Sequence, residues 1–359
     1  AARARDSIVS AHPGAEVDVV ELDLGDLSSV ERAAAAVADR GPLNLLVNNA
    51  GVMAPPRRET ADGFELQFGT NHLGHFALTG RLIESLLAAD SPRVVNVSSV
   101  AHRQGKLDFD DLNWERGYSR WPAYGRSKLS NLLFTLELAR RAEEAGTDLI
   151  AAAAHPGYSA TNLQTTGPGM GRVGVIVKPI SRLVNLVVAQ SDEKGALPSL
   201  YAATAPGVAG DDYIGPDGPG EWRGHPKRVG RSGRAANPED ARRLWEVSEE
   251  LTGVTYHALT RSGGGAPESS GLAAAQECRA PPVVIDRADA LAGRPCLELV
   301  ADAVDDPLGG PRSRELGHVG SGQPVGIALL HQVEEGDGPD EQPGQRGLLE
   351  AADAGLHAP

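Results

Sequence analysis

Hydrophobic residues in the first 256 positions fall into two kinds of segment. Short apolar runs of strand length occupy residues 43–47, 93–97, 148–154 and 212–216, and an alternating run covers 16–22. Longer segments with apolar residues every three or four positions lie between and around them, at 1–12, 28–37, 64–87, 128–144 and 238–251. Runs that are apolar throughout are typical of parallel strands buried on both faces. The alternation with helical segments therefore predicts an α/β fold built on a doubly wound parallel sheet.

Local signals set some of the expected boundaries. Ser28 followed by Glu31 has the spacing of a capping box, so we expect the second helix to begin at Ser28. Gly146 is expected to end the helix that runs through residues 128–144.

Small and polar residues follow each apolar run. The sequence has Asp23 after the alternating run, then Asn48-Asn49-Ala50-Gly51, Ser98-Ser99 and His155-Pro156-Gly157 after the later runs. Ligands of open α/β sheets bind at the carboxyl ends of the strands. These positions are therefore candidate site residues, although each of them is also an ordinary way for a chain to leave a strand.

Tyr124 and Lys128 form the strongest candidate pair for chemistry. They are four residues apart at the head of an apolar-periodic segment, so they share one face of a helix. A free phenol has a pKa near ~10, and an adjacent cation favours its ionised form by roughly 1–3 units. The spacing predicts a phenol that can donate and accept a proton. Packing of a tyrosine over a lysine stem is the plain alternative for the pair alone.

The order of the motifs resembles the short-chain dehydrogenase/reductase family. That family has an Asn-Asn-Ala-Gly turn, then an asparagine in a helix, then a serine at a strand end. The matching residues here are 48–51, Asn71 and Ser99. Further along, the family has Tyr-x-x-x-Lys and Pro-Gly-x-x-x-Thr, which are matched by Tyr124 with Lys128 and by Pro156-Gly157 with Thr161. The amino-acid sequence from Ser98 to Phe134 is similar to that of the retinol-dehydrogenase-like branch. The resemblance runs from about residue 10 to about residue 256 and implies a Rossmann-like three-layer sandwich.

The resemblance also implies roles for residues. Tyr124 is the expected proton donor, Ser99 orients the substrate oxygen, Lys128 holds the cofactor ribose and Asn71 completes a proton relay. The implied cofactor is NADP or NAD, and the implied contacts with it come from Asp23, Leu24, Asn49, Ala50, Gly51, Tyr124, Lys128, Pro156, Gly157 and Thr161. Asn48 is expected to brace the neighbouring strand, and His155 reads as a buried histidine rather than a proton carrier. Asp23 as a solvated turn carboxylate remains an open alternative.

Composition adds limits on location and partners. The net charge is −14, but the stretch from residue 257 onward holds 16 acidic residues against 7 arginines, so the acidity belongs mainly to the tail. We expect no nucleic-acid partner because no basic cluster is present. Both cysteines, Cys278 and Cys296, lie in the tail, which fits a reducing cytoplasm. The apolar stretch 173–190 is interrupted by charged residues and proline, so we expect no membrane span. We also expect no metal site.

Two features depart from the family pattern. A strand, glycine-rich turn and helix that hold the cofactor pyrophosphate are expected before Asp23, and the sequence has none, so we expect an N-terminally truncated domain over residues 1–256. Residues 257–359 contain no Phe, Trp or Tyr, so this tail is expected to be disordered. Translation of a shifted reading frame is one explanation of the tail, and a genuine appendage is the other.

The sequence therefore predicts an NAD(P)-dependent oxidoreductase that interconverts a hydroxyl and a carbonyl on a small hydrophobic substrate, with a homo-oligomer as a possible assembly. The polar, aromatic-dotted stretch from 100 to 122 is expected either to form one wall of the substrate pocket or to pack over the sheet edge. The alternative function is a catalytically inactive fragment that acts as a binding or scaffold domain, or an artefact of the gene model.

Overall fold

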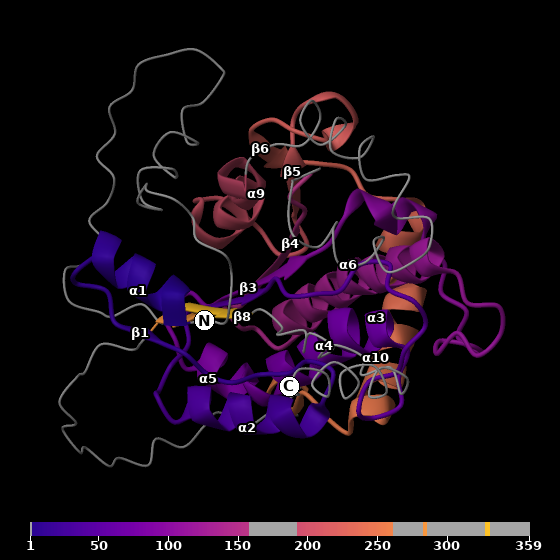
Figure 1. Cartoon of the computed structure of the whole chain (residues 1–359), viewed down its shortest axis with the longest axis horizontal. Helices are drawn as coiled ribbons and strands as arrows, with labels where there is room; N and C mark the ends of the chain where they lie inside the picture. The colour runs from indigo at the N-terminus through magenta and orange to yellow at the C-terminus, as the bar shows by residue number, and fades with distance from the viewer. Residues whose placement is uncertain (1, 158–191, 261–282, 286–326, 331–359) are drawn as a thin grey trace, which may run out of the picture.

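A parallel sheet between two helical layers forms the centre of the computed structural model (Figure 1). The structure describes residues 2–157, 192–260, 283–285 and 327–330. The strands are ordered β1-β7-β8-β2-β3-β4-β5-β6, and all neighbours are parallel except the β5–β6 pair. The predicted α/β fold class with its Rossmann-like three-layer arrangement is confirmed.

The central strands are the short apolar runs of the sequence. They are β2 (Leu45–Asn48), β3 (Arg93–Val97), β4 (Ile150–Ala154) and β5 (Tyr213–Pro216). Almost all of their residues are buried, because helices cover both faces of the sheet. The predicted boundaries of β3 are correct. At the edges lie β1 (Val17–Asp18), which is shorter than the expected strand at 16–22, and the antiparallel β6 (Pro226–Arg228).

Most helices follow the predicted periodic segments. The α-helices are α1 (Ala2–Ala11), α2 (Leu27–Ala38), α3 (Leu66–Phe68), α4 (Gly74–Arg81), α5 (Ile83–Leu87), α6 (Arg120–Glu144), α9 (Asp192–Thr204) and α10 (Pro238–Thr252). The prediction of a capping box at Ser28 is wrong. The N-cap of α2 is Asp26, whose side chain accepts a hydrogen bond from the Ser28 backbone N–H and so satisfies a free amide at the helix start.

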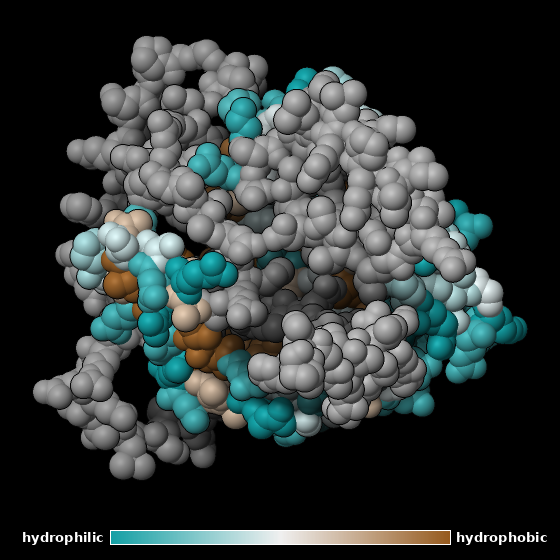
Figure 2. All heavy atoms as spheres, in the orientation of Figure 1, coloured by the Kyte–Doolittle hydropathy of each residue, from teal (hydrophilic) through white to brown (hydrophobic). Residues whose placement is uncertain are grey.

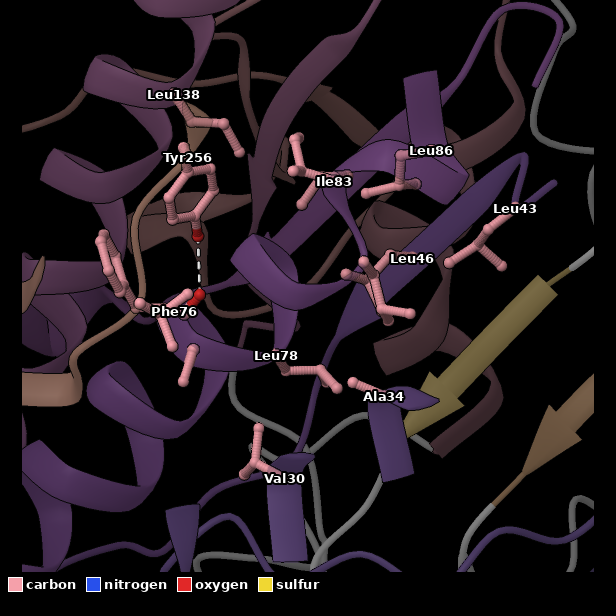
Figure 3. Packing of buried hydrophobic residues seen from close by; sticks show 14 of the residues in the cluster. Val30, Ala34, Leu43, Leu46, Phe76, Leu78, Ile83, Leu86, Leu138 and Tyr256 are labelled. Atoms are coloured by element: carbon pink, nitrogen blue, oxygen red, sulfur yellow. Dashed lines mark hydrogen bonds between the residues drawn. The ribbon is translucent and has the colours of Figure 1, made fainter. Parts of the chain in front are cut away.

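The larger hydrophobic core lies between the sheet and the layer of α2, α4, α5 and α6. Figure 3 shows Val30 and Ala34 of α2 facing Leu46 of β2 and Leu78 of α4. Tyr256 closes one end of this core, and its hydroxyl donates to the Phe76 carbonyl at 2.6 Å. A second cluster packs α9 against the other face of the sheet and includes Ala202, Val95 and Ile214. The two clusters fix the sheet between its helical layers, which positions the carboxyl ends of the strands.

Two short segments of the C-terminal tail belong to the sheet. β7 (Val283–Ile285) pairs with β1, and β8 (Ile327–Leu330) pairs with β2 in the register Leu45↔Ile327 to Asn48↔Leu330. β7 and β8 also pair with each other. Short apolar runs can add backbone ladders to a sheet without the aromatic side chains of a core, and the disorder expected for the tail stays a prediction. The division into domains at residue 256 stays a prediction.

The surface shows apolar and polar areas side by side. Figure 2 shows hydrophobic atoms in the region of α1 and β1, where Val9 and Val19 are exposed. A hollow of about 370 Å³ lies between α2, α4, α5 and residues 255–258, and none of the candidate site residues lines it. Within the described ranges, no helix has both the length and the apolar character needed to cross a membrane.

Candidate active site

Helix α6 carries Tyr124 and Lys128 into the interior. Both side chains are buried, with 6% and 4% of their surface exposed. The Lys128 Nζ lies 5.8 Å from the centroid of the Tyr124 ring and donates a hydrogen bond to the Val97 carbonyl at 3.1 Å. The predicted sharing of one helix face is confirmed, and the lysine is tied to the end of β3.

Ser99 stands at the carboxyl end of β3, where the chain leaves the sheet. Its hydroxyl caps the short 3-10 helix η2 (Val100–Gln104) by accepting from the Ala101 N–H at 3.2 Å, and the side chain is close enough to the Tyr124 phenol to lower the pKa of that phenol. Ser98, the other candidate in the pair, is buried and donates to the Lys128 carbonyl at 2.7 Å. Ser98 is thus engaged with the backbone of α6, and the choice of Ser99 as the serine that acts with the tyrosine stays a prediction.

Asn71 lies in a π-helical turn, Gly69–Leu73, between α3 and α4. Its amide nitrogen donates to the Val52 carbonyl and to Ser127 Oγ, each at 2.9 Å, and its carbonyl oxygen accepts from the Val52 N–H at 2.8 Å. The side chain thus joins the loop after β2 to α6. A mid-helix asparagine competes for backbone hydrogen bonds, and π-helical turns are frequent at functional sites, so this arrangement explains why the sequence has an asparagine here.

Gly51 brings the loop after β2 close to the same groups. A Cβ atom on Gly51 would lie 2.7 Å from Asn71 Oδ1 and 3.5 Å from Lys128 Nζ, so a larger residue would displace the asparagine. Asn48 donates to Asn96 Oδ1 at 2.8 Å and so braces the neighbouring strand as expected. Asn49 is exposed and Ala50 is buried. Four candidate residues from three elements, Asn71, Ser99, Tyr124 and Lys128, are therefore brought together at this edge of the sheet.

Burial sets the pKa values of the two residues on α6. Burial raises the pKa of Tyr124 to about 12, and the nearby Ser99 side chain works against that rise. Burial lowers the pKa of Lys128 to about 8. The expectation that the lysine lowers the phenol pKa is wrong for this structure, because desolvation of the phenol is the larger effect.

Pro156 and Gly157 follow β4 as predicted. Gly157 has φ of 70°, and a Cβ atom there would lie 2.5 Å from the Trp222 carbonyl oxygen, so the turn requires glycine. The Gly157 N–H donates to His155 Nδ1 at 3.2 Å. His155 is fully buried, and burial lowers its pKa to about 4, against the opposing effect of Glu221. It is therefore a neutral buried histidine, as expected, and Thr161 lies outside the described residues.

The loop after β1 contributes less to this cluster than the resemblance implies. Asp23 is exposed, and its carboxylate accepts from the Gly25 N–H at 2.7 Å. The Leu24 side chain is buried in the larger core, and its carbonyl faces Gly74 of α4. The roles of Asp23 and Leu24 in cofactor binding stay predictions.

Three site features were not predicted from the sequence. The Ser127 hydroxyl accepts a hydrogen bond from the Asn71 amide, and the backbones of Gly125 and Gly105 approach each other closely. The His102 ring forms a hydrogen bond with the Ser99 carbonyl. All four residues lie in the stretch around Ser99 and Tyr124 whose sequence resembles the family, and this resemblance is the signal that could have indicated them. Among the described residues, no group of three or more histidine, cysteine or acidic side chains could hold a metal ion.

Comparison with known proteins identifies the family. The sequence model of the short chain dehydrogenase family matches residues 1–168. Human Retinol dehydrogenase 14 is 40% identical over 243 residues, covering 67% of this chain and 68% of the relative. The chain belongs to the short-chain dehydrogenase family. Human Retinol dehydrogenase 12 is 43% identical over 242 residues, covering 67% of this chain and 71% of its own.

A solved structure supports the same assignment. The crystal structure of an uncharacterized protein from Mycobacterium paratuberculosis is 45% identical with a TM-score of 0.55, and the match covers 70% of this chain and 82% of that one. The chain is a short-chain dehydrogenase of the retinol-dehydrogenase-like branch. It is therefore an NAD(P)-dependent oxidoreductase acting on CH–OH groups.

The donor set of this short-chain dehydrogenase fits one half of a nicotinamide dinucleotide. An ammonium has three N–H donors, and the one hydrogen bond recorded for Lys128 among the described residues goes to Val97, which leaves donors for ribose hydroxyls. The residues that are present therefore fit the ribose and nicotinamide side.

Proposed function

We propose that this chain catalyses the NADP-dependent interconversion of a hydroxyl and a carbonyl on a small hydrophobic molecule. The observation that carries the proposal is the placement of Lys128 Nζ 5.8 Å from the Tyr124 ring centroid on one face of α6, where the lysine is tied to the end of β3 that leads into Ser99. When bound, the nicotinamide supplies or accepts the hydride. The remaining steps belong to the residues of this chain.

Tyr124 supplies the proton in the reduction direction. With a pKa raised to about 12, the phenol is fully protonated at neutral pH and can give its proton to the substrate oxygen as that oxygen gains charge. Ser99 donates a hydrogen bond that orients the same oxygen. Lys128 then holds the ribose through its ammonium, and Asn71 keeps the loop after β2 against α6.

The hydrophobic character of the substrate is supported by two observations. The Trp121 side chain is 52% exposed and lies edge-on to Tyr124, with 6.3 Å between ring centroids, so apolar surface stands beside the phenol. The matched relatives carry the name retinol dehydrogenase, and retinol is an apolar alcohol. The choice of NADP over NAD follows from the resemblance to this branch.

A coupled assay tests the proposal. The chain is mixed with NADPH or NADH and with all-trans-retinal, nonanal or a short polar aldehyde, and cofactor oxidation is followed by absorbance. We expect turnover with NADPH and the two apolar aldehydes, and we expect Tyr124→Phe to remove it. Turnover of the polar aldehyde alone, or equal use of both cofactors, would contradict the proposed specificity.

A second candidate is a chain that binds ligands without catalysing a reaction. Fluorescence titration with NADPH separates the two candidates. Micromolar binding together with turnover supports the enzyme, whereas turnover that is absent in every arm of the assay supports the binding domain. A cytoplasmic location and a homo-oligomer stay predictions.

A further inference from the structure

His102 lies fully buried between two segments of the chain that are far apart in sequence. Its Nδ1 is 2.7 Å from the Ser99 carbonyl oxygen, and its Nε2 is 3.2 Å from the Ser232 backbone nitrogen. A backbone N–H can only donate, so Nε2 must accept. In a neutral imidazole the proton then sits on Nδ1, which donates to the Ser99 carbonyl. The two contacts together select a single tautomer.

The other side of η2 is held by a close backbone contact with α6. A Cβ atom on Gly105 would lie 2.3 Å from the Gly125 carbonyl oxygen, and one on Gly125 would lie 2.8 Å from the Ala101 carbonyl oxygen. The start of η2 carries Ser99, whose side chain is close enough to Tyr124 to lower the pKa of its phenol. Ser99 is therefore placed by glycine packing on one side and by His102 on the other.

The groups that surround His102 favour the neutral form of its imidazole. The Tyr213 ring lies edge-on to it, with 5.6 Å between centroids. The charged groups that act on it are Arg103, Arg231 and Glu221. Arg103 and Glu221 are 2.7 Å apart as an ion pair, and Arg231 pairs with Asp211. Burial lowers the pKa of His102, and this fits an imidazole that accepts on one nitrogen and donates from the other.

We infer that His102 is a positioning residue that holds the Ser99 hydroxyl at the Tyr124 phenol by tying the Ser99 carbonyl to the segment at Ser232. The inference rests on the proposed function for its kinetic consequence, but its structural content does not depend on turnover. Loss of the imidazole leaves the Ser99 carbonyl with the His102 backbone N–H at 3.0 Å as its remaining donor among the described residues, and it removes the link from η2 to Ser232. A displacement of about 1 Å at a reacting group costs on the order of 10²-fold in rate.

Three substitutions separate positioning from simple packing. His102→Phe keeps the ring against Tyr213 and removes both hydrogen bonds. His102→Asn keeps a donor close to the position of Nδ1, and His102→Gln keeps an acceptor close to Nε2. We expect the order of kcat for all-trans-retinal with NADPH to be wild type, Asn, Gln and then Phe, with the Phe variant at least about 10-fold down. The Kd for NADPH should change less than about 2-fold.

A matched control and a direct readout complete the test. Val254→Ala removes buried methyl groups beside Gly80, away from every site residue, and should lower the melting temperature with little change in kcat. Heteronuclear NMR of histidine ring nitrogens, with the His102 signals assigned by their loss in His102→Asn, reports the tautomer without any need for turnover. A proton on Nε2, or a Gln variant at least as active as the Asn variant, overturns the inference. Failure of the proposed function would instead leave every variant inactive while the NMR result still decides the tautomer.

Discussion

Replacing Gly125 by alanine tests how closely η2 must approach α6. The added Cβ would lie 2.8 Å from the Ala101 carbonyl oxygen and 3.1 Å from the Gly105 nitrogen. Comfortable contacts begin near ~3.5 Å, and both neighbours are backbone atoms that cannot rotate away, so η2 must move by roughly half an ångström. That movement carries Ser99 away from Tyr124.

The effect on stability and the effect on rate should differ in size. Alanine stabilises a helix by about 1 kcal/mol relative to glycine, whereas overpacking destabilises the folded state by about 1–3 kcal/mol. The free energy of unfolding should therefore fall by about 0–2 kcal/mol. A shift of half an ångström at a reacting group should lower kcat about 10-fold. The variant is therefore expected to fold and to be slow.

The assay measures urea unfolding and carbonyl reduction with NADPH on the same preparation. Gly14→Ala is the control, because a Cβ there meets nothing within 4 Å and the residue lies outside the site. Deuteride-labelled NADPH shows whether hydride transfer limits the rate. If Gly125→Ala retained kcat within about 2-fold while hydride transfer was rate-limiting, the idea that this contact places Ser99 would be refuted.

Three further outcomes follow from the same geometry. Tyr124→Phe should lower reduction by about 10²–10⁴-fold and leave NADPH affinity nearly unchanged, because the ring and its packing remain while the proton donor is lost; stopped-flow reduction with parallel fluorescence titration measures both. Burial lowers the pKa of Lys128 from 10.5 to about 8, so between these pH values the unfolded chain binds more protons than the folded one and the free energy of unfolding should rise with pH. Urea unfolding from pH 7 to 11 should show this rise in the wild type and not in Lys128→Met. A chain ending at residue 260 should melt at a lower temperature, because β8 supplies four ladder partners to β2; an unchanged melting temperature would show that the tail is not part of the sheet.

Much of the fold could be predicted because burial on both faces leaves a local mark on the sequence. Residues 93–97 are an apolar run bounded by polar turns, and β3 has those boundaries. Ser99, Tyr124 and Lys128 could be identified because their spacing is fixed within one strand end and one helix turn. The N-cap of α2 was predicted two residues late, since Asp26 and Ser28 are both good caps and the sequence does not say which hydrogen bond forms.

The rest of the site depends on contacts across long sequence distances. His102 meets Ser232, which is 130 residues away, and no periodicity reports such a contact. Gly105 and Gly125 are ordinary loop and helix glycines in the sequence, and their mutual approach appears only once η2 crosses α6. The tail strands could not be predicted because four apolar residues can pair with a sheet, form a helix turn or remain unpaired.

The pKa of Tyr124 shows why spacing alone could not give the chemistry. Spacing places Lys128 on the same helix face, and an ammonium there would favour the phenolate. Burial, however, lowers the lysine pKa to about 8 and raises the phenol pKa to about 12, so the ammonium has lost its proton before the phenol can ionise. The cation is therefore absent over the pH range in which it could stabilise a phenolate. Near neutral pH the site therefore holds a protonated tyrosine beside a charged lysine, a state in which the phenol can give a proton to a carbonyl oxygen.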